Sequence, residues 1–157
     1  MRAQSTFVAF IIAILIVAII LIPTFILILD YSKPGAKPFD LARVAEEQIN
    51  GGSILIYFNS TPSKSYLIVP KPVNYTFLAG VFSITRGQFI NITALVQVVK
   101  FTPAGVSVVG NLSKPYPLVY NFSIPKRAWN TTLILQLIYY NVTVFATVYP
   151  NETAFTS

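Results

Sequence analysis

The chain has 157 residues, of which 54% are hydrophobic and only 10% are charged, and it contains neither cysteine nor histidine. This composition excludes disulfides and the commonest metal ligands, and it removes the usual general base of enzymes. The net charge of +6 comes from scattered basic residues, and Lys126-Arg127 is the only adjacent pair, which favours a solvated surface over a nucleic-acid site. We therefore expect no cofactor, no metal, no nucleic-acid partner and no enzymatic activity.

The first predicted element is an apolar helix over residues 7–29, in which Pro23 and Thr24 are the only residues that are not plainly apolar. At the helical rise it extends for about 35 Å, enough to cross the hydrocarbon core of a bilayer. No polar stripe runs along it, so we expect lipid or other helices of its own kind to surround it. Pro23 predicts a kink. Arg2 before the segment favours an orientation with the amino end inside and the large domain outside.

The apolar segment is longer than the core of a secretory signal, and no small-residue cleavage site follows it, so we expect it to be retained. After Asp30, the run KPGAKP at 33–38 predicts a short linker. Pro34 and Pro38 disfavour helical conformation in the residues before them.

A second, short helix is predicted over residues 41–49. Asp40 is its expected amino-terminal cap, and Asn50-Gly51-Gly52 closes it. One face carries most of its apolar residues, namely Leu41, Val44, Ala45 and Ile49. The adjacent Glu46 and Glu47 fall on the other side, where a solvated surface is expected rather than a pair of catalytic carboxylates.

From Ser53 onward, β-branched and aromatic residues dominate in short runs separated by Pro, Gly and Asn. The runs predict eight strands, at 54–58, 66–69, 75–83, 89–99, 106–109, 118–123, 133–139 and 142–149. Their number and spacing are typical of an antiparallel β-sandwich. We therefore expect an α+β chain with a hydrophobic helix at 1–30, a linker and short helix at 31–52, and a β-sandwich-like domain at 53–157.

Eight of the nine asparagines begin an Asn-X-Ser/Thr triplet, the acceptor sequon for N-glycosylation. They are Asn59, Asn74, Asn91, Asn111, Asn121, Asn130, Asn141 and Asn151. All eight follow the linker. This density indicates a glycosylated domain outside the cytoplasm, because a turn preference of asparagine alone does not explain the hydroxyl residue two positions later.

Alternation along the predicted strands supports the same interpretation. In the strands 89–99, 118–123 and 142–149, the sequon residues Asn91, Asn121 and Asn141 fall on the more polar face. Glycans at these sites could cover apolar positions on the outer face. The expected outer positions are Leu95, Val119 and Phe145.

An amino-terminal hydrophobic helix with one proline, followed by a cysteine-free, sequon-rich β-domain, resembles an archaeal type IV pilin. Such pilins enter the membrane by this helix, are cleaved by a prepilin peptidase, and are then extracted so that the helices pack in the core of a filament. The resemblance implies a helical homopolymer at the cell surface, used for adhesion, with the β-domains outside. Family leaders end in a charged residue followed by Gly or Ala. Arg2-Ala3 before Gln4 looks like that pattern, which makes Ala3 and Gln4 the expected cleavage site.

A second interpretation is a membrane-anchored accessory protein that binds the surface layer or another appendage. It is similar to the small archaellum stator-type proteins, which also combine one helix with a β-sandwich. The density of sequons favours the filament, because a filament is exposed to the environment along its whole length.

Overall fold

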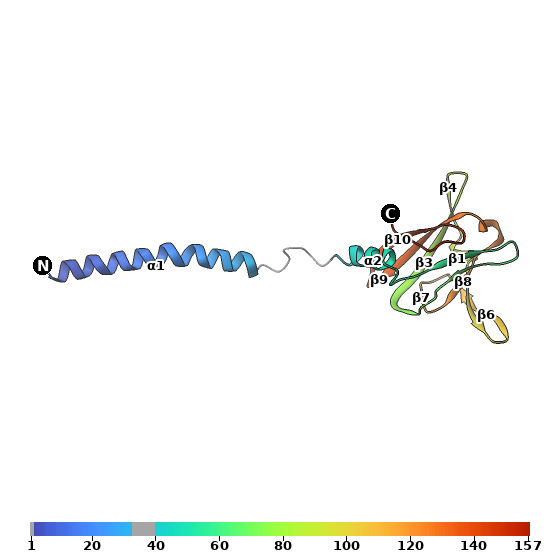
Figure 1. Cartoon of the computed structure of the whole chain (residues 1–157), viewed down its shortest axis with the longest axis horizontal. Helices are drawn as coiled ribbons and strands as arrows, with labels where there is room; N and C mark the ends of the chain where they lie inside the picture. Colours follow the sequence, from blue (N-terminus) through green and yellow to red (C-terminus); the bar gives the residue numbers. More distant parts are fainter. Residues whose placement is uncertain (1, 33–39) are drawn as a thin grey trace. The chain divides into compact units, whose positions relative to one another are not determined.

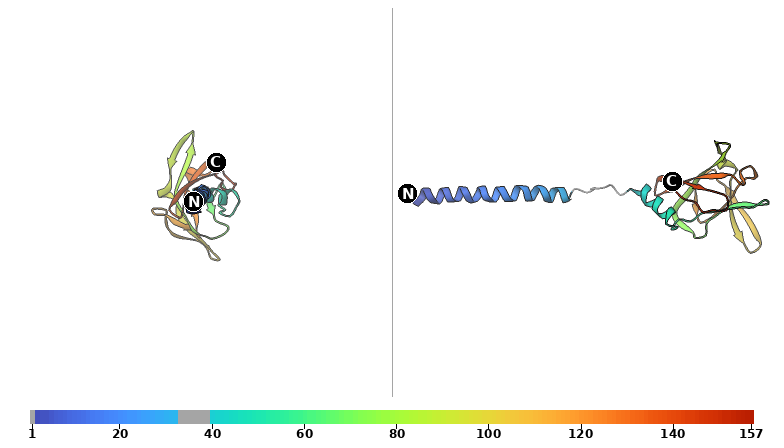
Figure 2. Two further views of the ribbon diagram at one scale, coloured as in Figure 1. Left: turned by 90° about the vertical axis from the view of Figure 1, so that its left-hand side faces the viewer. Right: turned by 45° about the horizontal axis from the view of Figure 1, so that its top comes forward.

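The computed structural model describes residues 2–32 and 40–157 of the chain. The chain divides into two compact units between Phe39 and Asp40. The first contains helix α1, Arg2–Ser32, and the second contains helix α2, Leu41–Asn50, followed by strands and two short 3-10 helices (Figures 1 and 2). The predicted linker 33–38 lies outside the described residues.

Helix α1 is longer at both ends than the predicted segment 7–29, and it continues without interruption through Pro23 (Figure 1). The helix begins at Arg2 because the polar residues before the apolar segment are compatible with a helical backbone. The hydroxyls of Ser5 and Thr6 both donate to the carbonyl of Arg2, at 3.1 and 2.9 Å. Hydroxyl bonds of this kind, to the carbonyl three or four residues earlier, fit a helical backbone.

Helix α2 forms where it was predicted. Asp40 has an extended backbone, and its Oδ1 accepts hydrogen bonds from the backbone N–H groups of Ala42 and Arg43, at 3.1 and 3.3 Å. Ala45 and Ile49 are buried in the same core as the sheets. Helix α2, which the sequence placed in the segment 31–52, therefore belongs to the unit Asp40–Ser157.

The second unit contains two antiparallel sheets. Sheet A has the strand order β1-β2-β8-β5-β6, and sheet B has the order β10-β9-β3-β4 with β7 also paired to β3. The strands are β1 Tyr57–Ser60, β2 Ser65–Ile68, β3 Val73–Thr85, β4 Gln88–Asn91, β5 Gln97–Thr102, β6 Gly105–Asn111, β7 Tyr116–Leu118, β8 Asn121–Ser123, β9 Thr132–Tyr139 and β10 Val142–Val148. The expected α+β architecture, an apolar helix followed by an antiparallel β-domain, is confirmed.

The core lies between the inner faces of the two sheets. Phe58, Leu67 and Phe122 enter it from sheet A, and Leu133 and Leu135 enter it from sheet B, each fully buried. Alternate residues of β10 behave as predicted, with Val144, Ala146 and Val148 inside. Burial of this apolar surface is the main driving force for folding the unit.

The predicted single strand 89–99 is wrong. The chain leaves sheet B at Asn91, makes the 3-10 turn η1, Thr93–Leu95, and enters sheet A as β5. Asn91 causes the break locally, because its Oδ1 accepts the backbone N–H of Thr93 at 3.0 Å and so replaces a ladder bond with a turn. The predicted strand 118–123 is likewise divided, into β7 and β8.

The carboxyl-terminal segment closes one side of the sandwich. Ala154 donates its N–H to the carbonyl of Ile56 just before β1, at 2.8 Å, while Phe155 and Thr147 of β10 exchange two backbone bonds of 3.0 and 2.8 Å. One short segment thus covers the edge of each sheet. The strands at the opposite ends of the two sheets, β4 and β6, have no further strand beside them in the described chain. Their hairpins project from the domain in opposite directions (Figures 1 and 2).

Candidate functional site: the apolar helix and the sequon surface

Helix α1 has no core of its own. The apolar stretch Arg2–Leu29 contains 28 residues, long enough to cross a membrane, and none of its most apolar window is buried. Large side chains such as Phe7 and Ile19 expose 64% and 70% of their surface. Because water disfavours such exposure, the helix requires an apolar environment.

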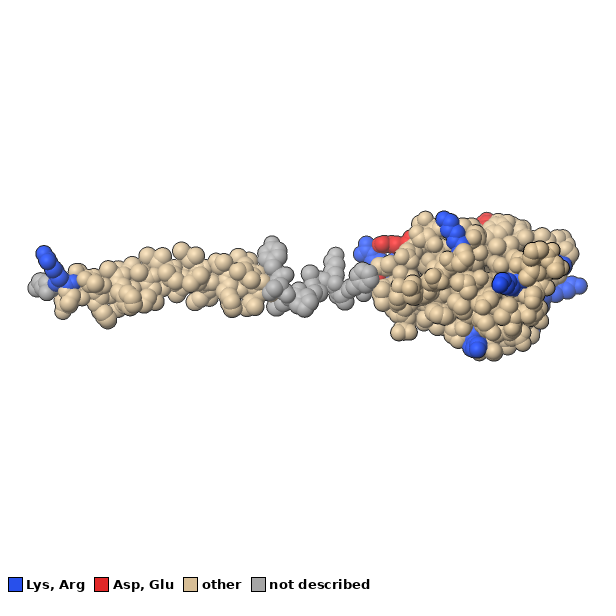
Figure 3. All heavy atoms as spheres, turned by 90° about the horizontal axis from the view of Figure 1, so that it is seen from below, with Lys and Arg blue, Asp and Glu red and all other residues tan. Residues whose placement is uncertain are grey.

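Three hydroxyl groups of α1 are satisfied within the helix. Thr24 donates its hydroxyl to the carbonyl of Ile20 at 2.7 Å, in the same way as Ser5 and Thr6 donate to Arg2. Arg2 is the one charged residue among the described side chains of the helix (Figure 3). The helix can therefore enter lipid or a packed helical bundle without leaving these hydroxyls unpaired.

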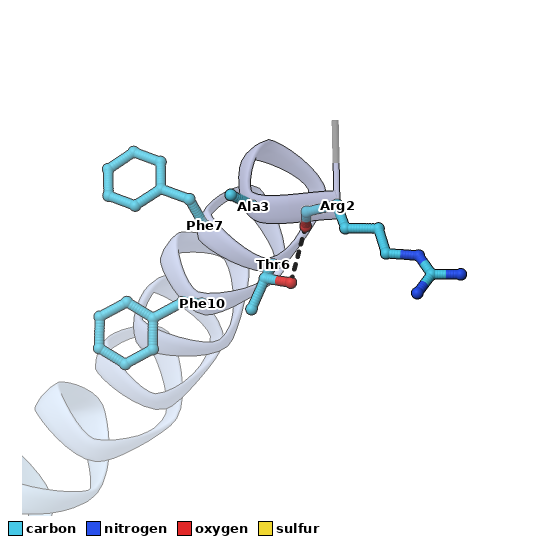
Figure 4. Close-up of a pocket in the computed structure, with 5 residues that line it drawn as sticks. All are labelled: Arg2, Ala3, Thr6, Phe7 and Phe10. Carbon is cyan, nitrogen blue, oxygen red and sulfur yellow. Dashed lines mark hydrogen bonds between the residues drawn. The ribbon is translucent and has the colours of Figure 1, made fainter.

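An open, shallow apolar hollow lies on the amino-terminal turns of α1. Arg2, Ala3, Thr6, Phe7 and Phe10 line it, and the rings of Phe7 and Phe10 project to the same side while the guanidinium of Arg2 points away (Figure 4). The expected cleavage residues Ala3 and Gln4 lie in this first helical region, and both are exposed.

The eight sequon asparagines all lie at the surface of the second unit. Six are exposed, and Asn59 and Asn121 are half-buried. The predicted outer positions Leu95, Val119 and Phe145 are also exposed, by 46%, 42% and 56%, as the sequence indicated. The surface therefore combines sequons with apolar side chains that protein atoms do not cover.

Sheet A carries sequons at both ends of one cross-strand row. Successive strand pairs place its five residues side by side on the outer face, in the order Asn59, Tyr66, Ser123, Gln97, Asn111. Asn121 lies two residues before Ser123 on β8, and its Oδ1 accepts the N–H of Val69 at 2.8 Å. Three of the eight sequons are thus presented by one face of one sheet.

Three sequons that are far apart in the sequence meet at Ser60. Ser60 follows Asn59, its N–H donates to Oδ1 of Asn151 at 3.0 Å, and its hydroxyl donates to Oδ1 of Asn130 at 3.0 Å. The N–H of Asn130 donates back to the same hydroxyl at 3.2 Å. No local pattern in the sequence predicts this cluster, because it depends on how the loops before β9 and after β10 fold onto β1.

Asn130, Asn141 and Asn151 have positive φ values of 56°, 67° and 62°. Asparagine tolerates this left-handed backbone better than most residues. Asn141 forms the two-residue turn of the β9–β10 hairpin together with Tyr140. Turn geometry thus also favours asparagine at these three positions, although it does not require the hydroxyl residue that follows each of them.

Several sequon hydroxyl residues are held within the fold, and the buried hydroxyl of Thr76 has no hydrogen-bond partner among the described residues. Thr76 is fully buried, and Thr93 both accepts the N–H of Val81 at 3.0 Å and donates to its carbonyl at 3.3 Å. Thr93 and Asn91 also share a surface hollow with Leu112 and Ser113 of the Asn111 sequon. A modifying enzyme that needs a free hydroxyl would have to act at Asn91 before η1 packs against β3, and at Asn74 before Thr76 is buried.

Two further places bring acidic or nucleophilic side chains together in the sequence, namely the adjacent glutamates of α2 and the Ser-Lys-Ser run at 63–65. Glu46 and Glu47 are exposed as predicted, and Glu47 forms a surface ion pair with Arg43 at 3.0 Å. In the loop 63–65, Lys64 is exposed whereas Ser65 is buried in β2. Within residues 2–32 and 40–157, no group of three or more Asp and Glu residues forms a metal-binding cluster.

Comparison with known proteins adds no relative: no family model, no curated protein and no solved structure matches the chain.

Proposed function

We propose that this protein is the structural subunit of an extracellular, type IV pilus-like adhesion filament. In this proposal α1 holds the subunit in the cytoplasmic membrane before assembly and then packs against α1 of other copies in the filament core. The second unit forms the outer layer, with N-linked glycans on its sequons. The chain acts as a building element rather than as an enzyme.

The observation that carries the proposal is the pairing of an apolar helix, whose large apolar side chains are exposed, with a domain whose core is built from its own residues. The side chains in the hydrophobic core all come from residues of Asp40–Ser157. The domain can therefore stay folded while α1 exchanges lipid for other helices. Helices in such a core gain stability from close van der Waals packing, which the apolar surface of residues 7–29 permits.

The restriction of the sequons to the second unit gives a second support. N-glycosylation takes place outside the cytoplasm, and each of the eight acceptor asparagines lies at the surface of the domain that a filament would expose. A sugar coat would also protect the unpaired edges β4 and β6 from unwanted strand pairing between filaments.

The experiment is to shear cells that make the protein and to image the released material by cryo-electron microscopy. The proposal expects helical filaments with a core of packed α1 helices and extra density beside Asn91, Asn121 and Asn141. Intact mass should exceed the 17.4 kDa of the polypeptide. If the intact mass equals that of the polypeptide alone, the protein carries no glycans and that part of the proposal is wrong.

The alternative is the membrane-anchored accessory protein. The observation in its favour is that α1, with its hydroxyls satisfied internally, is equally suited to remain in lipid as a single span. Shearing separates the two functions, because an anchored protein stays in the membrane fraction and yields no filament. That outcome would replace the filament proposal.

A further inference from the structure

Phe89 on the edge strand β4 is the most exposed aromatic residue of the second unit as described, at 69%. Its ring is not part of the hydrophobic core. Exposure of an aromatic ring to water is unfavourable, because transfer of apolar surface out of water lowers the free energy. Phe145, on the same outer face of sheet B but on β10, is also exposed, at 56%. The two rings differ in what stands beside them.

The strand register places Asn91 next to Phe89. Both are exposed residues of β4, and they lie on one face because side chains two positions apart point the same way, about 7 Å apart along the strand. On β3 their partners are Phe82 for Asn91 and Ile84 for Phe89. Asn91 therefore has the apolar side chains of Phe82 and Phe89 as neighbours on this face of the sheet. Ile90, between them, is paired with buried Ser83 and points to the other face.

The carboxamide of Asn91 is already oriented. Its Oδ1 accepts the N–H of Thr93 at 3.0 Å, and this bond does not use Nδ2, the atom to which an N-linked sugar is attached. The side chain therefore has one atom fixed by the turn and the other free to carry a substituent. A sugar attached there starts within reach of the Phe89 ring.

We infer that the first sugar of a glycan on Asn91 packs its apolar C–H face against the ring of Phe89. This inference rests on the proposed glycosylated surface. The C–H groups of a pyranose carry partial positive charge and the face of an aromatic ring is negative, so the contact is attractive as well as hydrophobic. Because the sugar is tethered two residues away, its effective concentration at the ring is high.

The same spacing recurs elsewhere in the chain. An aromatic residue stands two positions before the asparagine in half of the sequons, although aromatic residues make up 14% of the sequence. The four are Tyr57, Phe89, Tyr139 and Tyr149. Phe89 is the clearest case because both it and its asparagine are exposed within one strand.

The test is a double-mutant cycle on the glycosylated full chain from its native host. Phe89→Ala and Asn91→Gln are made singly and together, and Tm is read from the fluorescence of the single tryptophan, Trp129. Asn91→Gln also removes the turn bond from the N–H of Thr93, and that loss is common to both backgrounds. We therefore expect Asn91→Gln to lower Tm by about 3 °C more in the parent chain than beside Phe89→Ala. NMR of the glycoprotein should show sugar C–H protons shifted upfield by the ring, and the shift should disappear in Phe89→Ala.

Phe145→Ala is the matched control. It removes a similarly exposed ring from the same sheet face, on β10 at the far end of the order β10-β9-β3-β4. It should leave the effect of Asn91→Gln unchanged. A modified Asn91 with additive effects and no ring-current shift overturns the stacking and leaves the filament proposal intact. If intact-mass analysis shows that Asn91 carries no glycan, the stacking is overturned because there is no sugar to stack. Shearing then tests filament formation independently.

Discussion

Helix α1 and the domain that follows it differ in the exposure of their large apolar side chains. In α1 the large apolar side chains are exposed, with Phe25 at 63% and Leu21 at 59%, whereas in the domain residues such as Phe58 and Leu135 are fully buried. Propensity does not distinguish them, because both regions are rich in Ile, Leu, Val and Phe. What differs is periodicity. A helix that is apolar all round cannot turn a polar face to water, whereas a strand that alternates can.

The two units obtain their stability from different sources. The domain is stabilised within one chain, by the two sheets, by α2 and by the carboxyl-terminal segment. The helix contributes no residue to that core, and in the proposed filament other copies of α1 supply its apolar surroundings. Substitutions in the helix should therefore impair filament assembly, whereas substitutions in the core of the domain should lower its free energy of unfolding.

The largest expected effect is the loss of filaments on replacing Ile14 and Ile16 by Asp. Both side chains are 52% exposed on α1, so the folded domain gains nothing from them, whereas a helical core or a bilayer would have to bury two charges. We expect sheared material to contain no filaments, as judged by electron microscopy. The conservative pair Ile14→Leu and Ile16→Leu should leave filaments unchanged. Filaments that persist in the Asp variant would show that α1 is not the core.

Phe58→Ala should destabilise the domain by about 3–5 kcal/mol, because it removes a fully buried aromatic ring and leaves a cavity between the sheets. Ile19→Ala, which truncates a side chain 70% exposed on α1, should leave the same unfolding transition unchanged. Denaturant titration of the full chain in detergent, followed by Trp129 fluorescence, measures both. Equal effects of the two substitutions would mean that the units do not unfold independently.

Local signals in the sequence were sufficient for most of the fold. Asp40 predicted the start of α2, and the alternation in 142–149 predicted which side of β10 is buried. The break of 89–99 was missed because Ile90, Ile92 and Val96 keep an alternating pattern while the chain changes sheet. The polar bond that causes the turn, from Thr93 N–H to Asn91, has no periodic signature in the sequence.

The sequence predicted the sequons of the candidate site but not their arrangement. Exposure of the asparagines follows from alternation and from turns, which are local. The meeting of Asn59, Asn130 and Asn151 around Ser60 depends instead on loop contacts between residues 70 and 91 positions apart. Contacts of that range are fixed by the tertiary fold, and neither composition nor periodicity encodes them visibly.

Thr93 allows a structural role to be separated from a sequon role. Thr93→Val removes the hydroxyl that satisfies the N–H of Val81, which should cost about 1–3 kcal/mol in chains made with or without glycosylation. It also destroys the sequon at Asn91. Thr93→Ser should retain both, and Asn91→Gln should remove the sugar and keep the hydroxyl. Unfolding free energies and intact masses of the three variants distinguish the two roles. If the unglycosylated Thr93→Val chain were as stable as its unglycosylated parent, the hydroxyl of Thr93 would have no structural role.

The smallest expected effect decides to which region α2 belongs. Asp40→Ala removes the acceptor of two backbone N–H groups and should destabilise α2 by about 1 kcal/mol, while Asp40→Asn, which keeps an acceptor oxygen, should change little. If α2 unfolds together with the sheets, as burial of Ala45 and Ile49 in their core implies, the loss will appear as a lower denaturation midpoint at Trp129. A midpoint unaffected by Asp40→Ala would mean that α2 frays separately and that the cooperative unit begins after it. The contrast between the two regions would then be drawn at Ser53 instead of Asp40.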